Sequence, residues 1–420
     1  MDEVTEHVAR SAELARAAAP GLAAANDARL HAALGGVADR LESAGFELIA
    51  TSRDEVAAAE GTLSPAVIDR LRLDEERLAG MVEQVRELAA LPPAPRTGAR
   101  MTLDGGLELE ERRIPVGVIG ANYEARVNVT LDISSQLIKS RNAGVLRTGA
   151  AALRTAALLM DRVVGPALEG AGLPADAIQL VRVPAREAAH ALVSLPQLIP
   201  LVILRGSGPT TADLAATASR HGVRTLAHAE GGGVLYVDPS ADLDLALHLI
   251  ERSLDRLGVC NRLNLLLVHT GLWDSFVPRA TAVLEELGVT PSMPPHDHLV
   301  GYEWANDDER SATVTVAPIE GARHAAELAN DETSGLAASI VATDPGAAEE
   351  FLAAYRGTGG FWNATTRLLD GFRLFQAPET GINIDPLPGP RGPVTYRDLY
   401  LRQFVVSPPN GAAGRPISSS

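Results

Sequence analysis

Residues 114–149 decide the fold, and they read IPVGVIGANYEARVNVTLDISSQLIKSRNAGVLRTG. A short apolar strand at 114–120 is followed by a stretch of helical length and then by a second apolar strand at 143–147. Further apolar runs follow before residue 240, again separated by segments of helical length: AIQLVRV (177–183), PLVILRG (200–206) and VRTLAH (223–228). Strands that alternate with helices in this way predict a parallel, doubly wound α/β sheet.

A second α/β region begins near VLYVD (234–238). Its other strands are predicted at LNLLLVH (263–269), TVTVAPI (313–319), ASIVATD (338–344) and GGFWNAT (359–365). Residues 1–90 have apolar side chains at three- and four-residue spacing, which predicts helices. Residues 98–113 predict a β-hairpin that turns at Asp104-Gly105, and TYRDLYLRQFVV (395–406) predicts a strand that pairs with it. The Pro/Gly-rich residues 382–394 are expected to form a loop.

The composition argues against several classes of function. The 420 residues carry a net charge of −16, which disfavours nucleic acid and anionic membranes as partners. No apolar run approaches the roughly 18 residues that a membrane span needs. The single cysteine leaves no internal disulfide, so we expect a reducing, cytoplasmic setting. In this acidic field, an anionic substrate needs Arg or Lys side chains placed close to it.

Two local features suggest a site for charged groups. Lys139 is the only lysine in a chain that otherwise uses arginine, which indicates either a need for a compact ammonium or chance. The turn Gly206-Ser207-Gly208 lies between a predicted strand and a predicted helix, where backbone N–H groups can hold phosphate oxygens. The alternative is a plain turn in which Thr210 or Thr211 caps the helix.

Cys260 lies between a predicted helix and the strand at 263–269. A lone cysteine is most often a small buried hydrophobe. This one is flanked by Gly258 and Asn261, and Arg256 and Arg262 lie close in sequence. Because nearby arginines favour the nucleophilic thiolate, Cys260 is the candidate catalytic residue.

A metal site is not expected. His296-Asp297-His298 follows two prolines and has no third ligand in reach by sequence. We therefore predict a solvated turn at these residues.

The segment at 117–149 resembles the signature of glutamate-5-semialdehyde dehydrogenases, also called gamma-glutamyl phosphate reductases, a branch of the aldehyde dehydrogenase superfamily. Members of this family carry a YEARPNVT run followed by a K-x-GN-xxxLRGG stretch. The resemblance covers roughly residues 110–400 and continues in order through VLYVD (234–238), CNRLNLLLVH (260–269), WNATTR (362–367), ETGINI (379–384) and RGP (391–393).

The resemblance implies an α/β, aldehyde dehydrogenase-like fold with a Rossmann-type cofactor domain, an α/β catalytic domain and a small β oligomerisation hairpin. We expect the NAD(P)-binding domain at 1–235, with the hairpin at 100–114, and the catalytic domain at 236–375. Residues 376–406 would form a return segment and the C-terminal oligomerisation strand, and 407–420 a disordered tail. Because free hairpin edges invite strand pairing, a homodimer or homotetramer is expected.

The resemblance also implies roles for single residues. Cys260 matches the cysteine that forms a thioester with the substrate, and Asn128 matches the asparagine of the oxyanion hole. The implied cofactor-binding residues are Lys139, Arg147, Gly206, Ser207, Gly208 and Glu379, the last at the nicotinamide ribose. Arg126 and Arg367 match family arginines and are candidates for binding phosphate or carboxylate groups of the substrate.

The implied reaction is the reduction of an acyl phosphate, most simply gamma-glutamyl phosphate in proline biosynthesis, with NADPH or NADH as cofactor. The thiolate attacks the activated carboxylate, phosphate leaves, and hydride reduction of the thioester releases the aldehyde. This route needs no water-activating glutamate, and LAHAEGGGVL (226–235) lacks the ELGG element of hydrolytic dehydrogenases. His228 stands where the family often has a histidine.

Several positions depart from the family pattern. Val127 and Leu257 replace prolines, Arg141 replaces a glycine before Asn142, and Asn264 replaces a glutamate. Because unpaired buried groups are costly, such changes bear on specificity. The sequence leaves three hypotheses open: the proline-pathway reductase, a paralogue for another acyl phosphate or acyl thioester, and a catalytically weak relative that binds a cofactor or a partner.

Overall fold

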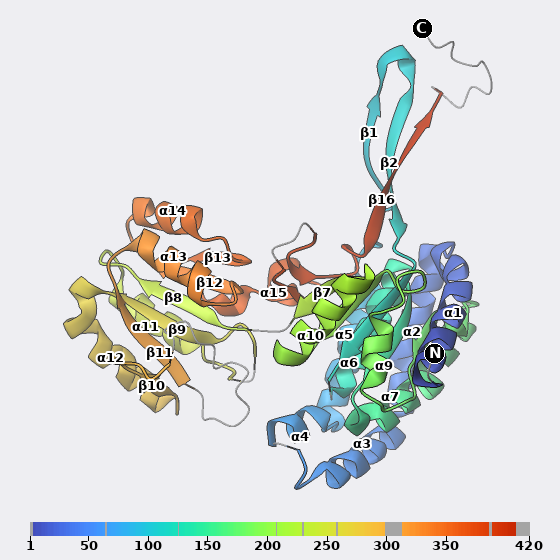
Figure 1. The fold of residues 1–420 in the computed structure, drawn as a ribbon, viewed down its shortest axis with the longest axis horizontal. Coiled ribbons are helices and arrows are strands. Elements are labelled where there is room, and N and C mark those ends of the chain that lie inside the picture. The colour runs from blue at the N-terminus through green and yellow to red at the C-terminus, as the bar shows by residue number, and fades with distance from the viewer. Residues whose placement is uncertain are drawn as a thin grey trace.

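The computed structural model describes residues 3–63, 65–124, 126–206, 208–228, 231–257, 259–298, 313–385 and 389–408. Figure 1 shows two α/β lobes and a narrow sheet that projects from the first of them. We call the part built around the sheet at 118–228 the first lobe, and the part built around the sheet at 233–362 the second lobe. The α/β class and the parallel sheets predicted from the sequence are confirmed.

The first lobe contains a five-stranded parallel sheet in the order β5-β4-β3-β6-β7. The strands are β3 (Val118–Tyr123), β4 (Ala143–Thr148), β5 (Ile178–Leu180), β6 (Leu201–Arg205) and β7 (Arg224–His228). The chain moves from β3 through β4 to β5 on one side, and then crosses to β6 and β7 on the other. The carboxyl ends of β3, β4 and β6 therefore flank a topological switch point, where sheets of this type bind ligands.

Helices cover both faces of this sheet (Figure 1). They are α1 (Glu3–Ala23), α2 (Asp27–Ser43), α3 (Gly45–Ala59), α4 (Pro65–Leu71), α5 (Glu75–Ala90), α6 (Val127–Ser140), α7 (Leu153–Leu159), α8 (Gly165–Gly170), α9 (Glu187–Leu192) and α10 (Gly208–His221). Helices α2 and α5 start where the side chains of Asn26 and Asp74 accept hydrogen bonds from backbone N–H groups of the first turn.

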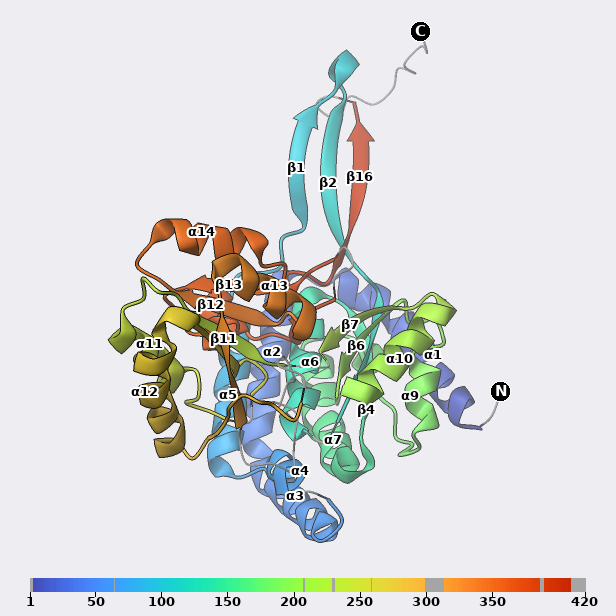
Figure 2. The same cartoon turned by 60° about the vertical axis from the view of Figure 1, so that its left-hand side comes forward.

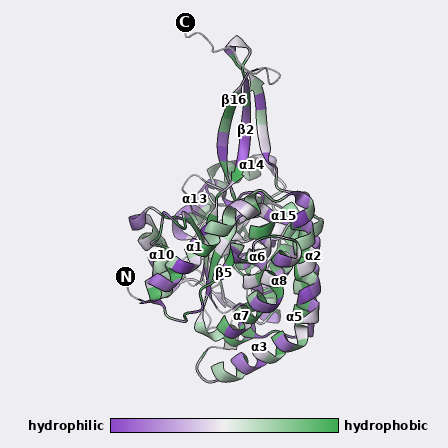
Figure 3. Ribbon diagram, turned by 90° about the vertical axis from the view of Figure 1, so that its right-hand side faces the viewer, coloured by the Kyte–Doolittle hydropathy of each residue, from purple (hydrophilic) through white to green (hydrophobic). Residues whose placement is uncertain are grey.

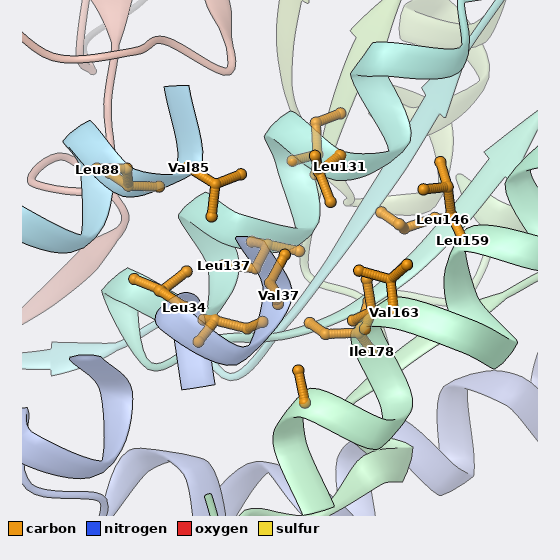
Figure 4. Packing of buried hydrophobic residues seen from close by; sticks show 14 of the residues in the cluster. Leu34, Val37, Val85, Leu88, Leu131, Leu137, Leu146, Leu159, Val163 and Ile178 are labelled. Atoms are coloured by element: carbon orange, nitrogen blue, oxygen red, sulfur yellow. The ribbon is translucent and has the colours of Figure 1, made fainter. Parts of the chain in front are cut away.

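The largest core of the first lobe is aliphatic. Leu34, Val37, Val85 and Leu137, from helices α2, α5 and α6, are buried in one cluster with Leu146 of β4 (Figure 4). The predicted helical character of residues 1–90 is confirmed, because the apolar stripes of these helices are buried there.

The second lobe has a six-stranded parallel sheet in the order β10-β11-β9-β8-β12-β13. Its strands are β8 (Gly233–Val237), β9 (Leu263–His269), β10 (Thr290–Ser292), β11 (Thr313–Ile319), β12 (Ala337–Val341) and β13 (Gly359–Trp362). Its helices are α11 (Leu243–Arg252), α12 (Trp273–Glu286), α13 (Ala322–Glu332) and α14 (Pro345–Ala354), with the short α15 (Gly371–Phe375) in the return segment.

The projecting sheet is antiparallel, and Figure 2 shows its three strands side by side. It consists of β1 (Thr97–Thr102), β2 (Glu108–Pro115) and β16 (Tyr400–Ser407), in the order β1-β2-β16. The predicted turn is confirmed: Asp104–Gly106 closes the hairpin, and Gly105 and Gly106 have φ of 78° and 77°, which glycine adopts without steric cost. The predicted pairing of the C-terminal strand with the hairpin is also confirmed.

Two sequence predictions need correction. The Pro/Gly-rich stretch at 382–394 is not simply a loop, because β14 (Gly381–Asn383) and β15 (Gly392–Val394) pair antiparallel there, and β14 lies beside β7. Strand β16 continues to Ser407, into the predicted tail, because it pairs with β2 over its whole length. The disorder predicted for the tail otherwise concerns residues 409–420, which lie outside the described residues. No helix in the described part of the chain is long and apolar enough to cross a membrane.

Candidate active site

Cys260 lies in the loop that joins α11 to β9, and its side chain is partly exposed. The glycines that open β8 pack directly on its backbone. The N–H of Gly232 donates to the Cys260 carbonyl at 2.6 Å, and a Cβ added to Gly231 would lie 2.7 Å from the Cβ of Cys260. The Gly-rich run 231–233 is therefore needed so that two segments can approach closely around the thiol.

The loop that carries Cys260 is also held from its other side. Asn261 donates through Nδ2 to the carbonyl of Leu369 at 3.0 Å, and its own carbonyl accepts from the Thr366 hydroxyl at 2.9 Å. These buried contacts fix the backbone next to the thiol. Cys260 itself packs against the cluster that contains Leu336 and Ile382.

Charged residues of the first lobe and of the return segment affect the pKa of the thiol. Burial raises the pKa of Cys260 to about 12, and the carboxylate of Glu379 adds to the rise, while Arg205 and Arg126 oppose it. Arg126 precedes α6, Arg205 ends β6, and Glu379 precedes β14. The positive charges that act on the thiol of the second lobe therefore come from the carboxyl ends of strands of the first lobe, where the switch point lies.

Arg126 and Arg205 form a pair of like charges beside the thiol. Burial lowers the pKa of Arg126 to about 10, and Arg205 contributes to the decrease. The positive charges of these two guanidinium groups favour the thiolate, and guanidinium groups are suited to bind a phosphate or carboxylate group. Arg126 was predicted from the sequence, and Arg205 was not.

Two carboxyl groups complete the surroundings of Arg205. Burial raises the pKa of Glu379 to about 7, and Glu379 accepts a hydrogen bond from the N–H of Gly371. Burial raises the pKa of Asp132 to about 6, against the effects of Arg205 and Asn128. Both carboxyl groups therefore change charge near neutral pH.

Asn128 lies in the first turn of α6 and its side chain is exposed. Its Nδ2 donates to Oδ2 of Asp132 at 3.0 Å, one helical turn further on. Asn128 thus belongs to the same charged group as Arg205. Asp132 could have been suspected from the sequence, because its spacing from Asn128 places both on one helix face. Arg205 carried a weaker signal, a charged residue at the carboxyl end of a buried strand.

Three of the predicted cofactor residues that the structure describes, Arg147, Gly206 and Gly208, lie at the carboxyl ends of strands of the first lobe. Glu379 lies in the return segment, and Lys139 is an exception. Arg147 is the penultimate residue of β4, and it donates to Oδ1 of Asn122 at 3.2 Å and to the carbonyl of Ala185 at 3.1 Å. Its Nε and the neighbouring Thr148 hydroxyl are buried and have no hydrogen-bond partner in the described structure. Such unsatisfied donors are costly unless a ligand satisfies them, so this edge fits a bound dinucleotide.

The predicted glycine turn follows β6 as expected. Gly206 succeeds Arg205, and Gly208 starts α10. A Cβ added to Gly206 would lie 3.0 Å from Oε1 of Glu124. Ser207 lies outside the described residues. Phosphate binding by this turn stays a prediction.

Lys139 is the exception. Its ammonium donates to the carbonyls of Ala89 at 3.1 Å and Leu91 at 2.6 Å, where α5 ends, and it lies 5.7 Å from the centre of the Tyr396 ring. It stands at the far end of α6 from Asn128, about 16 Å along the helix axis. These contacts favour a structural role for the single lysine and give no support to the predicted cofactor contact.

Arg367 also makes contacts other than those predicted. Its Nε lies 2.7 Å from Oδ1 of Asp255, and its guanidinium donates to Oδ1 of Asn261. The side chain is buried inside the loop that carries Cys260. Arg367 therefore holds the position of that loop, and its contacts do not support the predicted binding of substrate.

His296 and His298 lie in a local turn and contact the same serine. The hydroxyl of Ser292 lies 2.8 Å from Nε2 of His298 and 3.3 Å from Nδ1 of His296. Within the described ranges, no group of His, Cys, Asp and Glu side chains is arranged to hold a metal ion.

A doubly wound sheet with a switch point in one lobe, and a thiol in a loop of a second lobe, are typical of oxidoreductases that bind a dinucleotide. Residues 3–301 match the sequence model of the aldehyde dehydrogenase family, and the chain belongs to this family. A gamma-glutamyl phosphate reductase of Kineococcus radiotolerans is 34% identical to the chain over 96% of it and 95% of the relative.

Solved structures agree on the fold. A gamma-glutamyl phosphate reductase of Thermotoga maritima superimposes with a TM-score of 0.90 at 24% identity, covering 99% of this chain and 100% of the other. An engineered glycolyl-CoA reductase with bound NADP+ has a TM-score of 0.72 at 15% identity, covering 95% of this chain and 96% of the other. The enzyme is thus a dehydrogenase-type reductase that uses a nicotinamide cofactor.

Proposed function

We propose that this enzyme reduces gamma-glutamyl phosphate to glutamate-5-semialdehyde through a thioester on Cys260, with NADPH as its cofactor, in proline biosynthesis. The observation that carries the proposal is the pair Arg126 and Arg205, whose charges act on the chain's only thiol from the opposite lobe. The relative from Kineococcus radiotolerans, which bears the name of this activity, supports the choice of substrate.

The first step is acylation of Cys260. The thiol loses its proton, its sulfur bonds to the acyl carbon, and the bond from that carbon to the phosphate oxygen breaks. Glu379, whose charge acts on the thiol, is suited to accept the proton because its pKa of about 7 is close to neutrality. Arg126 and Arg205 are suited to hold the phosphate group and to stabilise the thiolate.

The second step is reduction of the thioester. When bound, the nicotinamide supplies the hydride that reduces the acyl carbon. The side-chain amide of Asn128 would donate to the alkoxide that develops on that carbon. The carbon–sulfur bond then breaks, and the thiolate is regenerated as the aldehyde leaves.

The chain's own residues account for where each ligand would be bound. Arg147, Gly206 and Gly208 lie at the carboxyl ends of strands of the first sheet and would hold the dinucleotide together with Ser207. Glu379 would contact the nicotinamide ribose. We accordingly assign cofactor binding to residues 1–235 and thiol chemistry to 236–375, an assignment that the separate sheets at 118–228 and 233–362 support.

We further propose that the enzyme is a cytoplasmic homodimer or homotetramer that assembles through the projecting sheet. The unpaired edges of β1 and β16 and the exposed Met101, Phe404 and Val406 support this. Figure 3 shows that hydrophobic residues reach far along this sheet. A reducing compartment suits a reaction that needs a free thiol.

The test is to measure oxidation of NADPH by absorbance with gamma-glutamyl phosphate generated by a carboxylate kinase, ATP and glutamate. We expect turnover that Cys260→Ala abolishes. Arg16→Gln, a change at an exposed position on α1, should leave it intact. Running the assay in parallel with NADH and with acyl thioesters tests cofactor and substrate choice.

Turnover that survives Cys260→Ala would refute the thiol mechanism. Turnover with acyl thioesters alone would favour the paralogue. Binding of NADPH without turnover of any activated acid would favour a cofactor-binding relative.

A further inference from the structure

A cavity of ≈310 Å³ lies where the projecting sheet joins the first lobe. Its size falls at the lower end of the roughly 300–1,000 Å³ range of small-molecule sites. The residues that line it come from β2, from the ends of α1 and α6, and from the segments that lead into β1 and β16, including the first residue of each strand. Among the residues that the structure describes, the lining contains no aspartate or glutamate and contains five arginines: Arg96, Arg112, Arg113, Arg141 and Arg397.

This concentration of positive charge opposes the character of the protein, whose net charge is −16. The charges also interact with one another. Burial lowers the pKa of Arg141, and Arg96 lowers it further. Lys139, behind the cavity, has its pKa lowered to about 8 by burial, and Arg141 and Arg397 contribute to that decrease. The fold thus holds these cations together against their mutual repulsion.

The internal partners of these arginines do not neutralise all of them. Arg141 pairs with Asp27, and Nε of Arg112 lies 2.7 Å from Oε2 of Glu110. Arg96 donates to the neutral carbonyl of Ala25 at 2.6 Å.

Arg113 and Arg397 have guanidinium N–H groups that could donate hydrogen bonds to a ligand. Nε of Arg397 donates to the Tyr396 hydroxyl at 3.1 Å. Nε of Arg113 is buried and has no hydrogen-bond partner among the described residues, and it lies 3.9 Å from Oε1 of Glu111. Within the described part of the chain, no carboxylate forms an ion pair with Arg96 or Arg397.

Aromatic rings hold two of the guanidinium groups in place. The Arg113 guanidinium lies 4.7 Å from the centre of the Tyr400 ring, and that of Arg397 lies 5.2 Å from the centre of the Tyr396 ring. Stacking of this kind fixes the guanidinium plane and leaves N–H groups at its edges to bind an anion. The donors are therefore organised before any ligand arrives.

We propose that this arginine cavity binds a small anion that carries phosphoryl groups, at a site separate from the thiol. Several guanidinium forks that converge on one space match the oxygens of phosphoryl groups better than a single carboxylate. The two sites lie at opposite ends of α6, since Arg141 follows its last residue and Arg126 precedes its first. A bound anion would bridge β2 to the body of the first lobe and would stiffen the base of the projecting sheet.

The test is calorimetric titration of the whole protein with inorganic pyrophosphate, at an ionic strength matched with sodium chloride. We expect saturable binding that is equal with and without NADPH and equal in Cys260→Ala, so that the result does not depend on the proposed reaction. Inorganic phosphate and citrate, titrated in the same way, separate a preference for free phosphate or for carboxylates from a preference for linked phosphoryl groups.

Substitutions locate the site. Arg397→Gln and Arg96→Gln should each weaken pyrophosphate binding by about tenfold, because each removes a charge-assisted contact. Arg16→Gln removes an equal charge from an exposed position on α1 and should have no effect. Thermal unfolding without anion checks that each variant is folded. The proposal is overturned if pyrophosphate does not bind saturably at millimolar concentration, or if binding is unchanged in both cavity variants.

Discussion

At the scale of single residues, opposing charges set the reactivity of Cys260. Burial and Glu379 raise the pKa of its thiol, and Arg205 and Arg126 lower it. The larger of these effects is burial, which favours the protonated thiol. The anionic substrate and the ionisation state of Glu379 would decide when the thiolate forms.

Alkylation by iodoacetamide measures this balance at the chain's single cysteine. With a pKa of about 12, the rate of alkylation should rise by about tenfold per pH unit through the alkaline range. The reason is that the fraction of thiolate, the reactive form, rises by the same factor. Glu379→Gln should speed alkylation and Arg205→Gln should slow it, because these groups act on the thiol in opposite senses. Mass spectrometry gives the rate. A plateau near neutral pH, or equal effects of the two substitutions, would contradict the charge balance.

Arg141 is a departure from the family pattern that the structure explains in part. It follows α6 with φ of 64°, the left-handed conformation that favours glycine. Its guanidinium donates to the carbonyl of Ala25 at 3.1 Å and pairs with Asp27. These contacts offset the backbone strain of an arginine at a position whose conformation favours glycine.

The strain at Arg141 can be separated from its contacts. Arg141→Gly and Arg141→Ala both remove the side-chain contacts, but alanine keeps the steric cost of a positive φ. We expect Arg141→Gly to be the more stable by about 1 kcal/mol in the free energy of unfolding, measured by urea denaturation. Equal stabilities would show that the backbone at this position relaxes.

At the scale of elements, a buried carboxylate joins two helices of the first lobe. Glu55 of α3 accepts from the backbone N–H of Arg154 at 2.7 Å and from the N–H of Thr155 at 3.3 Å, and also from the Thr155 hydroxyl at 2.5 Å. The side chain of Glu55 thus satisfies the free N–H groups at the start of α7 from a distant part of the chain.

Removing this carboxylate should cost stability. Glu55→Ala leaves buried donors without partners, so we expect a loss of about 2 kcal/mol in the free energy of unfolding. Glu47→Ala is the matched control on the same helix. Glu47 is exposed and pairs with Arg162 at 3.4 Å, a surface contact worth less than about 1 kcal/mol. Equal losses in the two variants would mean that the contacts of Glu55 add nothing.

At the scale of the whole molecule, the projecting sheet buries little of itself in the subunit. On one face, Met101, Leu109 and Val406 lie side by side across the three strands, and Phe404 follows on β16. Phe404 is 61% exposed and Val406 is 51% exposed. An apolar row of this kind on a sheet with free edges is typical of an oligomer interface.

The two faces of β16 provide a test of assembly. Phe404→Asp places a charge on the apolar row and should shift the enzyme toward monomers in sedimentation velocity. Gln403→Asp introduces the same charge on the opposite face, because successive residues of a strand alternate, and should leave the assembly unchanged. Dissociation in both variants, or in neither, would remove this face from the interface.

The sequence by itself determined the parallel sheets, the hairpin and the thiol, because periodicity and turn residues are local properties of the chain. It also pointed to Arg126 and Glu379, through the resemblance to a family. These residues reach one site from segments more than two hundred positions apart in the sequence.

The tertiary structure decided which charges meet. Arg205 and Asp132 interact because the fold brings the end of β6 close to the start of α6. The spacing of Asn128 and Asp132 could have suggested the second residue, but no local pattern predicts that Arg205 interacts with it. Lys139 and Arg367 form hydrogen bonds within the protein. The resemblance to the family had suggested that Lys139 binds the cofactor and that Arg367 binds the substrate. The arginine cavity likewise arises from segments that are distant in sequence, because electrostatic interactions depend on separation in space and not along the chain.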